Sequence, residues 1–277
     1  MRFVLIVYGL FIATAVNAAS YERTDGSIVN PILDTSGSIL SYSGPNLTPG
    51  VVLSGENLAS ADLLDADLQG SDMSNINLSS AKMWRSDLRD TNLTSSDLSG
   101  VFLFRSDMRG TDMTSAVLPN GDLQEVDLLG ATLDSANFQS VKLWSSDMRN
   151  TSIRNSDFSG ASLGGVDFLG SDLTDTNLAA AKVYQTIFHY VNISGTDLTS
   201  LEFYDHADWT NAYYFTDNEP TWQANMDPTF RAAAGIVPLS PGSSPLYPVP
   251  EPRAIALSAI AAIALLTRRP TSRIRQS

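Results

Sequence analysis

The sequence predicts an all-β repeat solenoid with a short cap at each end, and three observations on the 277-residue chain support this fold class. Every fifth residue from Leu53 to Phe203 is Leu, Met, Phe, Ile or Val, without a break in frame over 31 positions. The residue two positions before each of them is usually small, and the residue between is Asp or Asn in most repeats. Several side-chain types also recur every 20 residues. The first period fits neither a helix nor a strand, so the chain must turn one large side chain inward in each five-residue unit.

A single five-residue unit cannot be stable by itself. Burying its one large side chain contributes about 1.5 to 3 kcal/mol, whereas each ordered residue costs about 1 to 2 kcal/mol of backbone entropy. The units must therefore stack, so that successive coils close a continuous apolar core.

The 20-residue recurrence indicates four units per coil and nearly eight coils between residues 51 and 205. It consists of an Asp series, an aromatic series and an Arg series: Asp67, Asp87, Asp107, Asp127, Asp147 and Asp167; Trp84, Phe104, Trp144 and Tyr184; Arg89, Arg109 and Arg149. The strings ADLLD, ADLQG, SDMSN and TDLTS resemble the pentapeptide-repeat family. The resemblance implies a right-handed quadrilateral β-helix in which the large and small residues point inward.

Open solenoid ends need covers. Residues 19–50 are expected to cap the first coil, and residues 206–235 the last. The frame slips by one residue at His206, and Asp227-Pro228 indicates the start of a short helix that ends at Gly235. We expect an aromatic cap made of Trp209, Tyr213, Tyr214, Phe215 and Trp222.

The two termini indicate export. Residues 1–18 combine Arg2, an apolar run and small residues, which is typical of a cleaved signal peptide; an N-terminal anchor is the alternative. At the other end, a Pro-rich linker (236–252) precedes an apolar helix with a basic tail (253–277). Pro250, Glu251, Pro252, Arg268 and Arg269 resemble the PEP-CTERM sorting signal, which implies an exosortase-like processing partner; an ordinary single-span membrane anchor is the alternative.

Composition narrows the chemistry further. The formal net charge of −13 argues against nucleic-acid binding, and the absence of Cys excludes disulfides and thiolate sites. His189 and His206 fall in different coils, so we expect no catalytic residue, no cofactor and no metal site. The repelling Asp series needs compensation, for which turn hydrogen bonds come first, the nearby arginines second and calcium third.

One outer strip is both basic and aromatic, and it is the candidate binding face for a carbohydrate, an acidic polymer or another protein. The alternative is that its aromatic rings only cover flanking segments. The strip comprises Lys82, Trp84, Arg85, Arg89, Phe104, Arg105, Arg109, Lys142, Trp144 and Arg149.

These features predict a structural or binding solenoid and not an enzyme. It would be exported, held by the membrane or displayed at the surface, and would present the strip to matrix polysaccharide or a surface protein. The alternative is an acidic DNA-mimic inhibitor of a DNA-binding enzyme, which the family resemblance also allows. A glycosidase would need paired carboxylates across a cleft, and a convex rod offers none.

Overall fold

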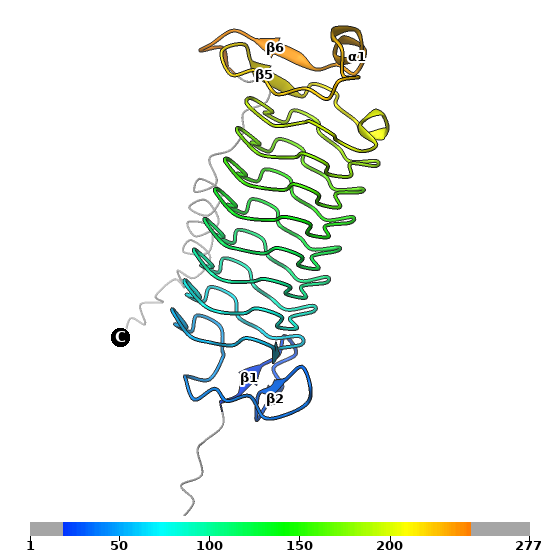
Figure 1. Cartoon of the computed structure of the whole chain (residues 1–277). Helices are drawn as coiled ribbons and strands as arrows, with labels where there is room; N and C mark the ends of the chain where they lie inside the picture. The colour runs from blue at the N-terminus through cyan, green and yellow to red at the C-terminus, as the bar shows by residue number, and fades with distance from the viewer. Residues whose placement is uncertain (1–18, 245–277) are drawn as a thin grey trace, which may run out of the picture.

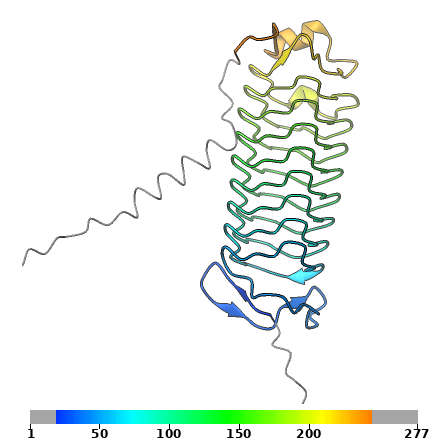
Figure 2. The same cartoon turned by 90° about the vertical axis from the view of Figure 1, so that its left-hand side faces the viewer.

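The computed structural model describes residues 19–244, and the chain forms a rod of stacked coils in which no long strand or helix occurs. Each coil has four five-residue sides, and outer residues 20 positions apart pair in parallel, as Asp67 does with Asp87 and Asp87 with Asp107. Figures 1 and 2 show the coils rising along the rod between two capped ends. We number the sides by the inward residues of one coil: side 1 holds Leu63, side 2 Leu68, side 3 Met73 and side 4 Leu78.

Each side ends in a tight turn, which is what lets a coil close in 20 residues. In the first corner of one coil the Ala66 N–H donates to the Leu63 carbonyl at 3.2 Å, and Asp65 between them has φ of 61°. A positive φ strains the backbone of any residue other than Gly. The strain is tolerated because the N–H of Asp65 also bonds the next coil, at the carbonyl of Trp84.

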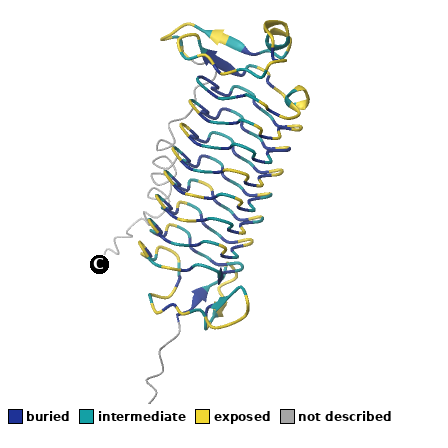
Figure 3. Cartoon of the chain, viewed as in Figure 1, coloured by how far each residue is buried: buried dark blue, intermediate teal, exposed yellow. Residues whose placement is uncertain are grey.

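The core is a set of four apolar columns inside the rod, visible in Figure 3 as the buried inner surface of every coil. Every predicted inward residue from Leu53 to Leu198 has at most 1% of its surface exposed, which confirms the frame. The small residues fill the corners; for example, Ser86 is buried and its hydroxyl donates to the Leu63 carbonyl. In two columns the aromatic rings stack directly, as Phe138 does on Phe158 with 4.5 Å between centroids.

Phe203 is the exception, and its predicted inward position was wrong. Its side chain is 48% exposed, and its φ of 62° turns the chain out of the coil into the short 3-10 helix η1 (Tyr204–His206). The frame slip at His206 is confirmed by the pairing of Ile187 with Asp208, one residue later than the 20-residue rule. Trp209 follows Phe188 in the column of side 2 after the one-residue slip and stacks on it, with 4.2 Å between ring centroids.

Residues 19–50 cover the first coil as expected. Three short strands form there, β1 (Tyr21–Glu22), β2 (Ile28–Val29) and β3 (Leu33–Asp34). β1 pairs antiparallel with β2, and β3 pairs antiparallel with β4 (Ala61–Asp62) on side 1 of the first coil. β3 therefore runs against the direction of the coil that it covers. The cap side chains of Tyr21, Ile32 and Leu47 are buried.

The last coil is covered by β5 (Tyr213–Phe215), α1 (Pro228–Ala233) and β6 (Val237–Leu239). The expected helix is present, and the Asp227 carboxylate accepts from the Phe230 N–H at its N-terminus. β6 pairs in parallel with β5, so the cap extends into residues 236–252, which we expected to be a linker throughout. Of the expected aromatic cap, Trp209, Tyr213 and Tyr214 are buried, whereas Phe215 and Trp222 are half-buried.

The expected signal peptide (1–18), sorting motif and apolar C-terminal helix lie outside the described residues. Among residues 19–244, no helix is long and apolar enough to span a bilayer.

Candidate functional site

The expected strip occupies side 1, side 2 and the corner between them. Lys82 and Lys142 lie on the outer surface of side 1. Trp84, Phe104, Trp144 and Tyr184 lie at the corner that follows, and we call these four residues the aromatic ridge. The Asp series lies on side 2, and Arg89, Arg109 and Arg149 follow it at the next corner. The coil geometry therefore brings the predicted strip residues together along the rod axis.

The rings of the aromatic ridge reach solvent, as the sequence indicated. Trp84 is 39% exposed, Trp144 49% and Tyr184 41%, while Phe104 is half-buried. Within residues 19–244, no ring of the ridge is covered by the N-terminal cap, because all four stay partly open to solvent. Partial exposure leaves one surface of each ring available for contact, although Tyr184 also packs against Phe203 and His206 of the segment that follows the coils.

The ring of Trp144 lies on the backbone of the next coil, at Gly164. A Cβ added to the buried Gly164, one coil further on, would lie 3.4 to 3.6 Å from three atoms of the Trp144 ring. Three nearly equal distances mean that the indole presents its face, and not its edge, to the backbone at Gly164. Its opposite face is then directed outward. Glycine at this position allows the ring to lie flat on the coil.

Tyr184 is held by aromatic contacts with the turn that leaves the last coil. Its ring makes an edge contact with Phe203 at 6.1 Å and lies 5.4 Å from the ring of His206. His206 in turn hydrogen-bonds Asp205 at 2.9 Å. The sequence could not have shown this contact, because it depends on Phe203 leaving the inward frame.

The arginines of the strip are paired with carboxylates of this chain. Arg85 makes a two-pronged pair with Asp65 at 2.7 and 2.8 Å, and Arg105 contacts Glu125 at 2.6 Å. Arg89, Arg109 and Arg149 each fold back on the Asp two residues before them, with an Nε to Oδ1 distance of 2.8 Å. The strip is therefore a mixed-charge surface and not a basic one.

The Asp series is compensated by the first two devices that we expected. The carboxylates of all six residues accept the backbone N–H two positions later, as Asp127 does from Leu129 at 3.0 Å. Five of them also lie within 4.0 Å of an Arg nitrogen, and three of these five (Asp87, Asp107 and Asp147) accept hydrogen bonds from the Arg two positions later. Among residues 19–244, no cluster of potential ligands suits a metal ion.

The pKa of an Asp in this series depends on whether an Arg hydrogen-bonds its carboxylate. Partial burial raises the pKa of Asp87, but hydrogen bonds from Arg89 outweigh it, and the net pKa lies below the ordinary value. Asp127 is followed by Leu129 where Asp87 has Arg89, and its nearest guanidinium is that of Arg109, with Nε 3.5 Å from Oδ2. Burial together with repulsion from Asp147 holds its pKa above the ordinary value.

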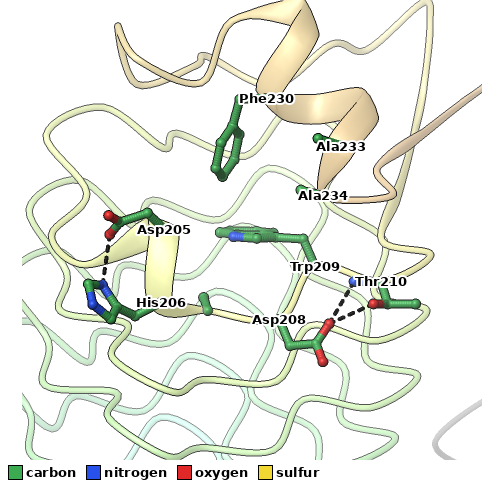
Figure 4. Close-up of a pocket in the computed structure, with 9 residues that line it drawn as sticks. Asp205, His206, Asp208, Trp209, Thr210, Phe230, Ala233 and Ala234 are labelled. Carbon is green, nitrogen blue, oxygen red and sulfur yellow. Dashed lines mark hydrogen bonds and ion pairs between the residues drawn. The ribbon is translucent and has the colours of Figure 1, made fainter.

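A pocket of about 530 Å³ lies at the C-terminal end between η1 and α1, where the sequence predicted no cleft. Its lining residues include Asp205, Asp208, Trp209 and Phe230. Figure 4 shows the two carboxylates directed apart, one toward His206 and the other toward Thr210. Burial raises the pKa of Asp208, but hydrogen bonds from Thr210 and His189 outweigh it, and the net pKa is lowered. The two carboxylates are directed apart, so they do not face one substrate position from two sides as a glycosidase pair does.

Comparison with known proteins supports the repeat architecture. A family model described as pentapeptide repeats matches eight copies, over residues 49–75, 71–110, 111–150, 131–168 and 151–189. No curated protein is similar enough in sequence to count as a relative.

Several solved structures resemble the chain in fold. HetL, a pentapeptide repeat protein involved in heterocyst differentiation regulation in the cyanobacterium Nostoc sp. strain PCC 7120, is 23% identical, with 71% of this chain and 90% of HetL covered and a TM-score of 0.38. QnrB1, a plasmid-mediated fluoroquinolone resistance protein, is 15% identical, with 64% and 84% covered and a TM-score of 0.30. A pentapeptide repeat protein of the Arabidopsis thaliana thylakoid lumen is 23% identical, with 50% and 71% covered and a TM-score of 0.19. Such values carry no inference about function.

Proposed function

This chain belongs to the pentapeptide-repeat family, whose fold is a right-handed β-helix, and we propose that it is an exported, non-enzymatic binding solenoid that presents the aromatic ridge to an extracellular polysaccharide or a surface protein. The observation that carries the proposal is the placement of large exposed rings at one corner of the rod. Trp84, Trp144 and Tyr184 are each about two-fifths to one-half exposed. Aligned exposed aromatic rings on one corner of the rod indicate a contact surface.

The mixed-charge surroundings of the ridge refine the kind of contact. Arg85 and Arg105 are already paired with Asp65 and Glu125, so a ligand gains little by offering further negative charge. The contact energy would come from ring stacking and from desolvation of the rings.

Export rests on the terminal sequences. Residues 1–18 have the pattern of a signal peptide, and residues 250–277 resemble a PEP-CTERM sorting signal followed by a basic tail. A chain sorted in this way would be released or anchored outside the inner membrane, by way of an exosortase-like protease. The DNA-mimic alternative requires a cytoplasmic location instead.

Binding is tested with the mature segment, residues 19–250, and extracted matrix polysaccharide or surface protein. The Trp84→Ala, Trp144→Ala double variant should bind at least about tenfold more weakly, because loss of one aromatic anchor often costs more than about 1 kcal/mol. Val117→Ala is the matched control, since Val117 is 40% exposed on side 4. Equal affinity of the double variant and the parent would refute the ridge as the binding face. A large drop in melting temperature would instead show that the tryptophans are structural.

Export is tested separately by deletion and fractionation. Removal of residues 253–277 should release a soluble, folded protein outside the inner membrane, because residues 19–244 contain no helix that could anchor it. A full-length protein found in the cytoplasm would contradict export and favour the DNA-mimic alternative.

A further inference from the structure

We propose that the ligand of the aromatic ridge is an uncharged, extended glycan that runs parallel to the rod axis and stacks sugar rings on Trp144 and Tyr184. This inference rests on the proposed function and names the chemical class of its ligand. Four features of the described residues lead to it: the internal pairing of the arginines, the orientation of the two rings, their spacing along the rod, and the polar groups beside them.

The first feature is charge. An acidic polymer would need guanidinium groups that are not already committed to carboxylates. In this chain Arg85 is paired with Asp65 through two hydrogen bonds, and Arg149 with Asp147. A polyanion would have to displace these internal carboxylates or lie beside them, and both cost free energy. A neutral ligand meets neither cost.

The second feature is the orientation of the rings. Trp144 lies flat on the backbone at Gly164, so its outer face forms a platform that needs no rearrangement before a sugar ring stacks on it. Tyr184 is held in place by contacts with the rings of Phe203 and His206. Rings that are fixed before binding lose little conformational entropy when a ligand stacks on them.

The third feature is the spacing along the rod. Trp144 and Tyr184 occupy the same corner two coils apart, which is about 10 Å at the usual distance between paired strands. Gly164 occupies the intervening position and has no side chain of its own, and the Trp144 ring lies over it. An extended glycan repeats over a similar length every two sugars, so alternate rings would meet Trp144 and Tyr184.

Polar groups for sugar hydroxyls lie beside the platform. Ser145 is exposed at the same corner as Trp144, and Gln124 occupies the ridge position one coil earlier. The Gln124 side-chain amide donates to the Asp122 carboxylate at 2.9 Å, which fixes the orientation of its carbonyl oxygen. Hydroxyl and amide groups can donate to or accept from neutral sugars without any charged partner.

The test is calorimetric titration of residues 19–250 with a panel of neutral hexasaccharides (cellohexaose, chitohexaose, xylohexaose and mannohexaose), the corresponding disaccharides, and hexagalacturonate as the acidic probe. At least one neutral hexasaccharide should bind, at least about tenfold more tightly than its disaccharide, because only the longer chain reaches both rings. Its affinity should change less than about twofold between low and high salt, as expected where no exposed charges pair across the interface.

Variants locate the site. Trp144→Ala and Tyr184→Ala should each weaken hexasaccharide binding by about tenfold, whereas Val117→Ala should leave it unchanged. All three should melt close to the parent, since the altered side chains are exposed. A hexasaccharide that binds equally to parent and ridge variants would overturn the proposed site.

The remaining outcomes separate this inference from the proposed function. Preference for hexagalacturonate, with affinity that falls steeply with salt, would overturn the neutral-ligand inference and leave the ridge as a binding face. Failure of every neutral hexasaccharide, combined with ridge-dependent capture of a surface protein, would also overturn the inference and retain the proposed function. Matrix or protein binding that survives the Trp84→Ala, Trp144→Ala change would refute the proposed function itself.

Discussion

Leu98 provides the sharpest test of the inward frame, because its neighbour Ser99 lies on the outside of the same turn. Leu98 is 1% exposed and packs in the column of side 4 between Leu78 and Leu118, both fully buried. Ser99 is half-buried at the corner, and its N–H donates to the Asp97 carboxylate at 3.0 Å. We therefore compare Leu98→Asp with Ser99→Asp, and with Leu98→Ala as a neutral reference.

The expected magnitudes follow from burial. Leu98→Ala removes a buried side chain and leaves a cavity, at a cost of about 2 to 5 kcal/mol. Leu98→Asp adds the cost of burying a carboxyl group without a partner, so its total should exceed that of the Ala variant and reach at least about 4 kcal/mol. A domain has only about 5 to 15 kcal/mol of stability, so cooperative folding should be lost or nearly lost at neutral pH. Ser99→Asp should change stability by less than about 0.5 kcal/mol.

The assay is urea denaturation followed by circular dichroism and tryptophan fluorescence. Acidification should recover part of the Leu98→Asp loss, because a buried carboxyl group takes up a proton more readily than a carboxyl group in water. Leu98→Ala should show no such recovery. Equal shifts of the denaturation midpoint for Leu98→Asp and Ser99→Asp would refute the assignment of inward and outward positions.

Two further predictions concern the Asp series and the C-terminal cap. Leu129→Arg should place a guanidinium beside Asp127, as Arg89 lies beside Asp87, and should lower the raised pKa of Asp127. In the parent, the stability contributed by Asp127 is present in acid and is lost as the pH rises through that pKa. In the variant, the contribution of Asp127 should instead be present at neutral pH and be lost as the pH falls. The gain in the free energy of unfolding at neutral pH should not exceed about 1 kcal/mol, because the Asp127 side chain is 42% exposed. Leu129→Gln is the matched control, since Gln69 occupies the equivalent position. Melting curves between about pH 3 and pH 7 with an NMR titration of Asp127 provide the measurement, and an unchanged titration would contradict the pairing. Trp209→Ala should cost about 3 to 5 kcal/mol, since the ring is 1% exposed and stacks on Phe188, whereas the half-buried Phe215→Ala should cost less. Hydrogen exchange should show the loss first in the last coil, and uniform loss along the rod would contradict a local capping role.

The repeat frame could be predicted from the sequence because it depends on local rules that repeat. One large residue in five must be buried, and each Asp or Asn before it can accept a nearby backbone N–H. Both rules hold in the structure, as the burial of Leu98 and the bond from Ser99 to Asp97 illustrate. The helix after Asp227 could be predicted for the same reason, since its cap lies within three residues in the sequence.

The candidate site could be predicted only in part. The 20-residue recurrence placed Trp84, Phe104 and Trp144 at one corner, because parallel pairing carries equivalent residues to the same position. It did not show that Arg85 and Arg105 pair with residues of the preceding and following coils, since the rotamers of long side chains depend on neighbours across the coil.

The sequence by itself determined the solenoid, its frame and the corner that carries the aromatic rings, because these follow from a periodicity that one chain displays along its length. Only the tertiary structure decided where the frame ends, how the caps pair and how the strip is charged. Phe203 turns outward where the coil opens into η1, and Trp209 ends the next column by stacking on Phe188. β6 belongs to the cap because it pairs with β5, in which Tyr213 is the partner of Val237, 24 residues later in the chain. Such pairings depend on which segments meet in space, and no local periodicity encodes them.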